Sequence, residues 1–129
     1  MILVDEAYVE FSGVTAVPLI RTYPNIIIVR TLSKAFGLSS LRIGYMVASE
    51  MYIRELVKIR GPFDVNMMAY TAALASTGDQ KNVQKYVKEV MYTSKPMMEQ
   101  FFNKNGIPFY TSSANFILYK PVQEQEEKI

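Results

Sequence analysis

The sequence predicts an α/β protein in which a mainly parallel sheet is flanked by helices. The first observation is a pair of short runs with wholly apolar interiors, Met1–Val4 and Asn25–Arg30. Such runs are typical of strands that a parallel sheet buries on both faces. The second observation is the helical periodicity of apolar residues in Ser49–Arg60 and Gln80–Asn103. Strands that alternate with helices are the pattern of the α/β class.

The first strand, Met1–Val4, stands at the very start of the sequence. Domains rarely begin in a buried central strand, so we expect this chain to continue a longer polypeptide. Val14–Tyr23 then predicts a short helix, limited by Pro18 and Pro24 because proline has no backbone N–H to donate. The second strand, Asn25–Arg30, follows directly.

A loop and a third strand come next. Thr31–Leu41 is rich in small residues, among them the turn former Gly37. Arg42–Ala48 predicts a strand, and Ser49 is placed to cap the helix that follows it. Gly61-Pro62 ends that helix, because neither residue favours its continuation.

The second half of the chain is mainly helical. Asn66–Ser76 predicts a helix of small residues, and Asp79 is placed to cap the next one. Gln80–Asn103 is the longest helical pattern, and we expect Pro96 to kink it near Tyr92.

A short strand and part of a helix close the chain. Phe116–Tyr119 predicts a final strand, and Val122–Ile129 predicts the first turns of another helix. We therefore expect residues 1–78 to be the C-terminal part of a large α/β domain. Residues 79–129 would form a connector helix and the start of a small α+β domain.

Composition excludes several kinds of chemistry. The net charge is +2, which gives no electrostatic reason to expect nucleic acid or a membrane as a partner. Cysteine and histidine are both missing, which excludes disulfides, thiolate nucleophiles, the usual zinc sites and a Ser-His-Asp triad. The longest apolar runs are far shorter than the roughly 20 residues of a membrane helix. The acidic pair Asp5-Glu6 also argues against a signal peptide, so we expect a cytoplasmic protein.

Polar side chains follow the ends of the predicted strands. The candidate site residues are Asp5 and Tyr8 after the first strand, Thr31, Ser33 and Lys34 after the second, and Arg42 at the start of the third. Ligands of open parallel sheets gather at the carboxyl ends of the strands. If these strands are neighbours, the six side chains converge on one edge of the sheet.

This set of groups suits pyridoxal phosphate. A lysine amine can form a Schiff base with its aldehyde, and a carboxylate can keep its pyridine nitrogen protonated. Hydroxyl groups and an arginine suit its phosphate. Taken singly, each residue also has a structural interpretation: Asp5 as a cap, Lys34 as a solvated loop residue, Arg42 as a partner of a carboxylate, and Tyr8 as an aromatic at the edge of the core.

The motifs are similar to those of the fold-type-I aminotransferases, and most of all to histidinol-phosphate aminotransferases. The resemblance rests on five segments: Val4–Tyr8, Thr31–Leu38, Arg42–Tyr45, Gly61–Asn66 and Ser113–Phe116. It spans nearly the whole chain, and the segment around Lys34 is specific in length and composition. The family also uses an N-terminal half and a C-terminal end that this chain does not contain. The resemblance therefore implies the middle part of an enzyme.

The resemblance also implies a role for each candidate residue. Lys34 would form the Schiff base and move the proton, and Asp5 would face the pyridine nitrogen. Tyr8 would hydrogen-bond the phenolate oxygen of the cofactor. Ser33 and Arg42 would bind the phosphate, with Thr31 assisting.

The implied reaction is reversible amino transfer between a small-molecule donor and 2-oxoglutarate, by a homodimer. Two alternatives stay open. The parent could be another fold-type-I enzyme, such as an aromatic aminotransferase or a threonine-phosphate decarboxylase, or the chain by itself could be a non-catalytic fragment.

Three positions depart from the family pattern, one of them Pro96, which interrupts a helix that is normally continuous. Ser40 stands where the family often has glycine, so a left-handed backbone there would be strained. Asp64 replaces the first asparagine of the family's Pro-Phe-Asn-Val-Asn segment.

Overall fold

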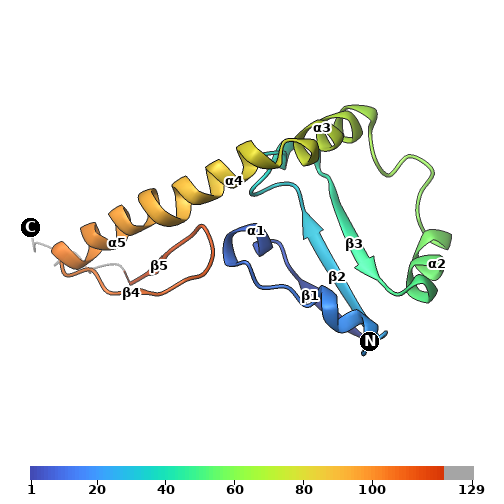
Figure 1. The fold of residues 1–129 in the computed structure, drawn as a ribbon, viewed down its shortest axis with the longest axis horizontal. Helices are drawn as coiled ribbons and strands as arrows, with labels where there is room; N and C mark the ends of the chain where they lie inside the picture. The colour runs from blue at the N-terminus through green and yellow to red at the C-terminus, as the bar shows by residue number, and fades with distance from the viewer. Residues whose placement is uncertain (121–129) are drawn as a thin grey trace, which may run out of the picture.

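The computed structural model describes residues 1–120, which contain a three-stranded sheet with the order β1-β2-β3 (Figure 1). The strands are β1 (Ile2–Asp5), β2 (Ile26–Thr31) and β3 (Gly44–Ala48). β1 and β2 are parallel, whereas β3 is antiparallel to β2. The expectation of a mainly parallel sheet is therefore corrected for these residues: the sheet is mixed. The helix expected over Val122–Ile129 lies outside the described residues.

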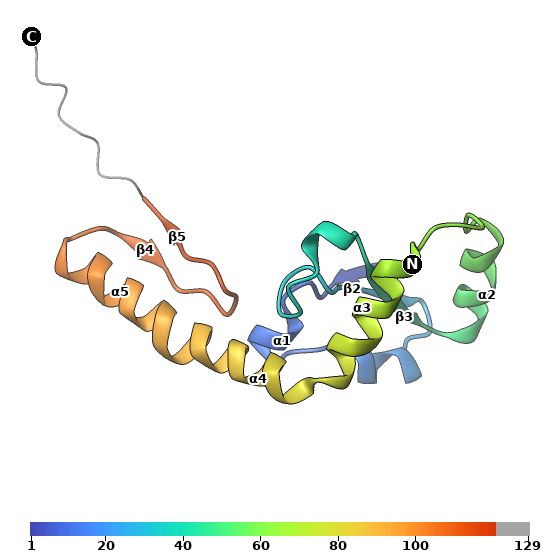
Figure 2. The ribbon, with the colours of Figure 1, turned by 90° about the horizontal axis from the view of Figure 1, so that it is seen from above.

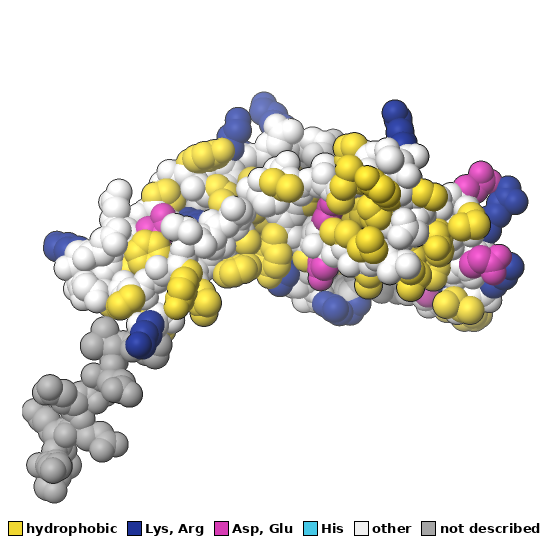
Figure 3. Space-filling model, turned by 90° about the horizontal axis from the view of Figure 1, so that it is seen from below, with side chains coloured by type: hydrophobic (Ala, Val, Ile, Leu, Met, Phe, Trp, Pro, Cys, Tyr) yellow, Lys and Arg dark blue, Asp and Glu magenta, His cyan; other side chains and the backbone are white. Residues whose placement is uncertain are grey.

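Burial differs between the two apolar strands. Ile28 of β2 is fully buried, and Ile26 and Ile27 are nearly so, as the sequence predicts. In β1, Ile2 and Leu3 are 53% and 63% exposed, so the expected burial of this strand on both faces is wrong for the described chain. Hydrophobic side chains gather on the end of the molecule that holds the sheet (Figure 3).

Two short helical segments connect β1 to β2. A single-turn helix that the sequence pattern did not reveal, α1 (Val9–Ser12), follows β1. The helix expected over Val14–Tyr23 is a 3₁₀ turn, η1 (Val17–Arg21), with Pro18 in its first turn. Proline fits there because the first N–H groups of a helix have no partner within it.

The connection from β2 to β3 and the helices after β3 follow the predicted order. A 3₁₀ turn, η2 (Ser39–Leu41), precedes β3, and α2 (Glu50–Lys58) and α3 (Met67–Gly78) follow it. The side chain of Asn66 caps α3 by accepting a hydrogen bond from the N–H of Ala69 at 2.8 Å. Ser49 precedes α2 as predicted, but its hydroxyl donates to the carbonyl oxygen of Pro24 instead of capping the helix.

One long helical rod runs away from the sheet (Figure 2). It consists of α4 (Gln80–Glu89), a π-helical turn (Val90–Ser94) and α5 (Lys95–Lys104). Asp79 caps α4 as predicted, since its carboxylate accepts from the N–H of Asn82. The π turn contains Tyr92 and stands just before Pro96, where a regular helix would need an N–H that proline lacks. The irregularity that the sequence predicted near Tyr92 is therefore a π turn.

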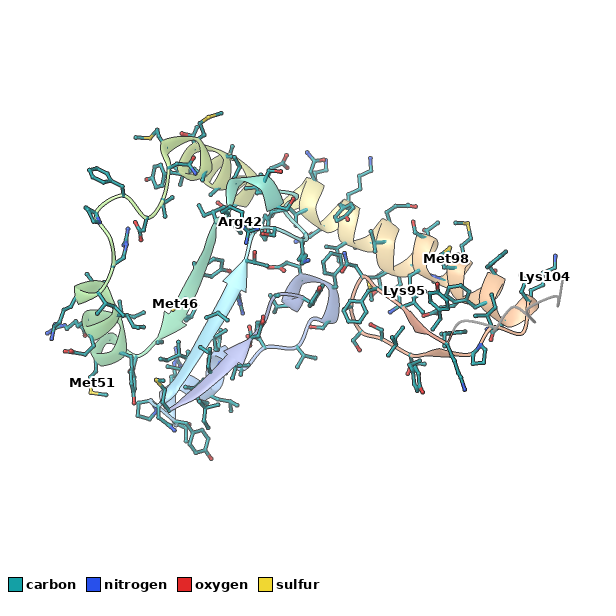
Figure 4. All side chains as sticks on the ribbon, turned by 180° about the vertical axis from the view of Figure 1, so that it is seen from behind. Arg42, Met46, Met51, Lys95, Met98 and Lys104 are labelled. Atoms are coloured by element: carbon teal, nitrogen blue, oxygen red, sulfur yellow. The ribbon has the colours of Figure 1, made fainter. Side chains whose placement is uncertain are left out.

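A hairpin packs beside the end of the rod. It pairs β4 (Phe109–Tyr110) with β5 (Leu118–Tyr119) in antiparallel register, and only the second of these strands was predicted. Lys95 of α5 is buried, and its Nζ donates to the carbonyl oxygens of Ser112 and Ala114 (Figure 4).

A small core joins the rod to the sheet. Phe11 of α1, Ala35 of the loop after β2 and Val83 of α4 form this core, and Tyr8 and Phe36 pack against it. None of the helices in residues 1–120 has the length and apolar character that crossing a membrane requires.

Candidate functional site

The candidate residues gather at one edge of the sheet. Parallel pairing places Asp5 opposite Val29, so β1 and β2 end at the same edge. Antiparallel pairing places Thr31 opposite Gly44, so β3 begins where β2 ends. Arg42, two residues before Gly44, consequently lies at this edge as well (Figure 4). The antiparallel third strand is what brings Arg42 to the same edge, because a parallel strand would begin at the opposite one.

Lys34 and Tyr8 are in contact. The Nζ of Lys34 lies 5.6 Å from the centroid of the Tyr8 ring, within the range of a cation–π interaction. Lys34 is exposed and Tyr8 is half-buried. The buried side chains of Leu32 and Ala35 anchor the backbone on either side of Lys34. The lysine therefore stands on a fixed loop, with its side chain exposed beside Tyr8.

A tight turn holds this loop. The N–H of Gly37 donates to the carbonyl oxygen of Lys34 at 3.1 Å, and that of Leu38 donates to the carbonyl oxygen of Leu32 at 2.9 Å. Gly37 has a φ of 70°, a left-handed conformation in which a side chain would be strained. This conformation explains the glycine that the sequence shows three residues after Lys34.

Thr31 and Ser33 form a pair of adjacent hydroxyl groups. The hydroxyl of Thr31 donates to the Oγ of Ser33 at 2.8 Å, and the N–H of Ser33 donates to the Oγ1 of Thr31 at 3.1 Å. Both residues are half-buried. The arrangement presents two hydroxyl groups and a neighbouring backbone turn on one side of the Lys34 loop.

Arg42 has a left-handed backbone, with φ 54° and ψ 50°. This conformation costs a residue with a Cβ about 1–2 kcal/mol. Its guanidinium donates to the carbonyl oxygen of Ser39 at 3.0 Å, and its side chain is exposed. The strain expected at Ser40 is not there: Ser40 lies in the turn η2, and the left-handed residue is Arg42.

Asp5 is exposed at the end of β1, and its Oδ1 accepts from the N–H of Ala7 at 2.8 Å. This bond makes the carboxylate part of a local turn, which was the structural interpretation of the residue. Asp5 and Tyr8 line a hollow of about 320 Å³, whereas Lys34 lines a different hollow of about 720 Å³. The structure thus places Asp5 and Lys34 at one edge but in separate depressions.

Sequence reasoning missed the most extensively bonded group near this edge, Glu6. Its buried carboxylate accepts from the N–H of Ala16, the hydroxyl of Thr15 and the guanidinium of Arg30. Burial by itself raises the pKa of Glu6, but the hydrogen bonds from Ala16, Arg30 and Thr15 outweigh burial and hold the pKa below its usual value. A signal was present in the sequence, since Glu6 and Arg30 stand directly beside Asp5 and Thr31.

Asp64, where the resembled family has asparagine, pairs with a cation. The guanidinium of Arg60 donates to both carboxylate oxygens of Asp64. The hydrogen bond from Arg60 lowers the pKa of Asp64, and the same bond raises the pKa of Arg60. The departure from the family pattern therefore supplies an ion pair within the segment that joins α2 to α3.

The segment before β5 also reaches the candidate site. The rings of Tyr8 and Phe116 meet edge to face, with centroids 5.3 Å apart and planes at 74°. Lys95 holds the backbone of Ser112 and Ala114, just ahead of Phe116. The hairpin is thereby in contact with an aromatic ring that also contacts Lys34.

Known proteins resemble this chain in sequence and in structure. The sequence pattern of the family described as aminotransferase class I and II matches residues 1–128. The histidinol-phosphate aminotransferase of Sulfurisphaera tokodaii is 42% identical over 119 residues, which are 92% of this chain and 33% of that protein.

Two crystal structures agree with this similarity. The histidinol-phosphate aminotransferase of Sinorhizobium meliloti, in complex with pyridoxal-5'-phosphate, has a TM-score of 0.82 at 28% identity and covers 89% of this chain and 32% of its own. That of Clostridium acetobutylicum has a TM-score of 0.80 at 26% identity and covers 92% of this chain and 37% of its own.

This chain therefore spans about a third of the length of the curated relatives that it matches. The match along nearly the whole sequence confirms the resemblance that the segments around Asp5, Lys34 and Arg42 indicated. With this similarity and the shared fold, the chain belongs to the class I and II aminotransferase family.

Proposed function

We propose that this chain supplies part of the pyridoxal phosphate site of an aminotransferase of the histidinol-phosphate kind. The whole protein would transfer an amino group reversibly between a small-molecule donor and 2-oxoglutarate. The observation that carries the proposal is the arrangement around Lys34. Its amine lies against Tyr8, at the sheet edge that also holds Asp5, a hydroxyl pair and a strained arginine.

The chemistry of these donors fits the cofactor. The adjacent hydroxyls of Thr31 and Ser33 and the guanidinium of Arg42 suit a phosphate dianion, since charged and hydroxyl donors make strong bonds to its oxygens. The left-handed backbone of Arg42 is retained at a cost in stability, which is common at binding sites. Asp5 offers a carboxylate at the same edge.

Each residue has a distinct task in the proposed site. Pyridoxal phosphate supplies an aldehyde and an electron-withdrawing ring when bound. The Nζ of Lys34 would hold the cofactor covalently through its aldehyde, and its amine would accept and return a proton at the substrate. The carboxylate of Asp5 would keep a proton on the ring nitrogen, and the hydroxyl of Tyr8 would donate to the phenolate oxygen.

We further infer the organisation of the protein. Residues 1–78 would belong to the large, cofactor-binding domain, and the residues from 79 onward would form the connector helix and the start of the small domain. The active protein would be a cytoplasmic homodimer. The contact between Tyr8 and Phe116 supports a site that lies between the two domains.

Covalent labelling tests the cofactor site. The full chain is mixed with pyridoxal phosphate, reduced with borohydride, digested and analysed by mass spectrometry for modified lysines. We expect yellow colour before reduction and modification concentrated at Lys34. Lys34→Ala should lose both signals, whereas Lys104→Ala, which changes an exposed lysine at the far end of α5, should keep them (Figure 4). Equal labelling of many lysines would refute the assignment of Lys34.

The substrate is tested separately with the complete gene product. Transamination of 2-oxoglutarate is measured with histidinol phosphate and with phenylalanine, and loss of carboxylate from threonine phosphate is measured beside them. We expect the highest kcat/KM with histidinol phosphate. A preference for either of the other substrates would overturn the histidinol-phosphate assignment and leave the cofactor site intact.

A further inference from the structure

We propose that Glu6 and Arg30 are a positioning pair that fixes the sheet edge on which Asp5, Thr31 and Lys34 stand. The proposal rests on the function proposed above, because it concerns residues that would act through the cofactor site without touching the cofactor. Neither residue belongs to the set that the sequence motifs assign to the cofactor.

The pair connects the strands at the edge. Since Asp5 is opposite Val29 in parallel register, the next residues along, Glu6 and Arg30, face each other across β1 and β2. Both Nε and Nη2 of Arg30 donate to the Oε2 of Glu6, at 3.0 and 2.8 Å. The side chains are 5% exposed for Glu6 and 19% for Arg30. Water is thus nearly excluded from a short, two-point contact.

The row continues to the third strand. Arg30 is opposite Tyr45 in antiparallel register, and its Nη1 donates to the Tyr45 hydroxyl at 3.4 Å. The hydroxyl of Tyr45 and the carboxylate of Glu6 raise the pKa of Arg30 against the opposing effect of burial. One guanidinium therefore bonds side chains on both neighbouring strands.

Glu6 extends the same network to the loop after α1. Its Oε1 accepts from the backbone N–H of Ala16, and both of its oxygens accept from the hydroxyl of Thr15. Arg30 also donates to Thr15 at 2.9 Å. The segment that leaves β1 is in this way bound back onto the end of β2.

Strand geometry makes the pair act on the site indirectly. Neighbouring residues of a strand point to opposite faces, so Glu6 and Arg30 point away from the face of Asp5 and Thr31. Holding Glu6 and Arg30 in register also holds the backbone of Asp5 and Thr31 in register. A buried ion pair often gives no more stability than apolar residues of the same size. Its hydrogen bonds, however, restrict the orientation of the two side chains, and of the strands that carry them, more than apolar packing does. Fixed direction is what a covalent cofactor site needs.

Two conservative variants separate positioning from stability. Glu6→Gln keeps the acceptor oxygen for Ala16 but removes the charge. Arg30→Lys keeps the charge but removes the planar guanidinium, whose two N–H groups donate to Glu6 together. The matched control is Glu50→Gln, which makes the same change of residue in the ion pair that Glu50 forms with Arg54 on α2, away from the loop after β2. All three are compared in the full chain at temperatures where each is equally folded by circular dichroism.

Two measurements are made on each variant. One is the labelling of Lys34 by pyridoxal phosphate and borohydride, divided by the labelling of all other lysines. The other is the exchange rate of the N–H groups of Ala7 and Ser33, which donate to Asp5 and Thr31. For Glu6→Gln and Arg30→Lys we expect labelling selectivity to fall roughly tenfold, the factor that accompanies loss of a charge-assisted hydrogen bond, and both N–H groups to exchange faster. Glu50→Gln should leave both measurements unchanged.

The outcomes distinguish the two proposals. Unchanged selectivity and exchange in both variants would overturn the positioning role, as would an equal loss in Glu50→Gln. If the unaltered chain shows no preference for Lys34, the proposed cofactor site fails. The exchange rates at Ala7 and Ser33 then still decide whether the pair holds the edge.

Discussion

Replacing Arg42 should separate the stability of the fold from its affinity for the cofactor. Arg42 holds a left-handed backbone with φ 54°, which costs about 1–2 kcal/mol for any residue with a Cβ. Glycine avoids this cost but loses about 0.4–1 kcal/mol through its freedom in the unfolded chain. Arg42→Ala and Arg42→Gly both remove the bond to Ser39, so this loss cancels when the two variants are compared. The free energy of unfolding of the glycine variant should therefore be about 0.5–1 kcal/mol higher than that of the alanine variant.

Cofactor affinity should respond differently. Both variants remove the guanidinium proposed to hold the phosphate, and a hydrogen bond to a charged group contributes about 1.5–3 kcal/mol. We therefore expect pyridoxal phosphate to bind both variants about 10- to 150-fold more weakly, by the relation between free energy and affinity. Urea unfolding measures the stabilities, and titration of the visible absorbance measures the affinities. An alanine variant at least as stable as the glycine variant would show that the backbone at Arg42 is not strained. Unchanged affinity of both variants for pyridoxal phosphate would refute the proposal that Arg42 binds the phosphate.

Three further predictions concern the same edge of the sheet. A Cβ on Gly44 would lie 2.5 Å from the carbonyl oxygen of Arg30, so Gly44→Ala should push β3 from β2 and lower the free energy of unfolding, measured with urea, by about 1–3 kcal/mol. Because the pKa of Glu6 is lowered in the folded state, its charged carboxylate stabilises the fold fully above the usual value of 4.5, and this stabilisation is lost as pH falls below that value. In Glu6→Gln, the free energy of unfolding should therefore decrease less steeply as pH falls below 4.5. Burial raises the pKa of Glu10, whose Oε2 is buried without a hydrogen-bond partner among the described residues. The charged carboxylate therefore destabilises the fold at pH 7, and Glu10→Gln should raise the free energy of unfolding there by up to about 1 kcal/mol. This gain should shrink as pH falls toward 4.5, where the carboxyl group becomes neutral.

Local patterns in the sequence revealed the strands and the residues at their ends. The apolar run at Ile26–Ile28 is buried, and the capping side chains of Asn66 and Asp79 accept the bonds expected of them. These features depend on neighbours a few residues away, and periodicity and capping chemistry report on such neighbours. The same reasoning predicted that the side chains after the two strands would lie at one edge, where the structure places the Nζ of Lys34 5.6 Å from the centroid of the Tyr8 ring.

Features that depend on distant partners were not predictable in this way. The antiparallel direction of β3 and the bond between Glu6 and Arg30 each join segments far apart in the sequence. The exposure of Ile2 and Leu3 likewise depends on what packs against β1, which an apolar run does not specify. The four-residue helix α1 is too short to produce a periodic pattern.

The π turn at Val90–Ser94 lies between α4 and α5, so it bears on the direction in which the side chains of α5 point around the helix axis. Each residue of an α-helix advances the rotation by about 100°. A π turn holds one residue more than an α-helical turn, so removing one residue from it would restore a regular helix and leave the direction of Lys95 and Phe102 nearly unchanged. Removing one residue from α4 would instead swing these buried side chains about a quarter of a revolution away from the hairpin. The number of residues in the regular part of the rod, more than their identity, thus dictates whether the hairpin docks. Homologous sequences should accept a one-residue gap at the π turn more readily than one within α4.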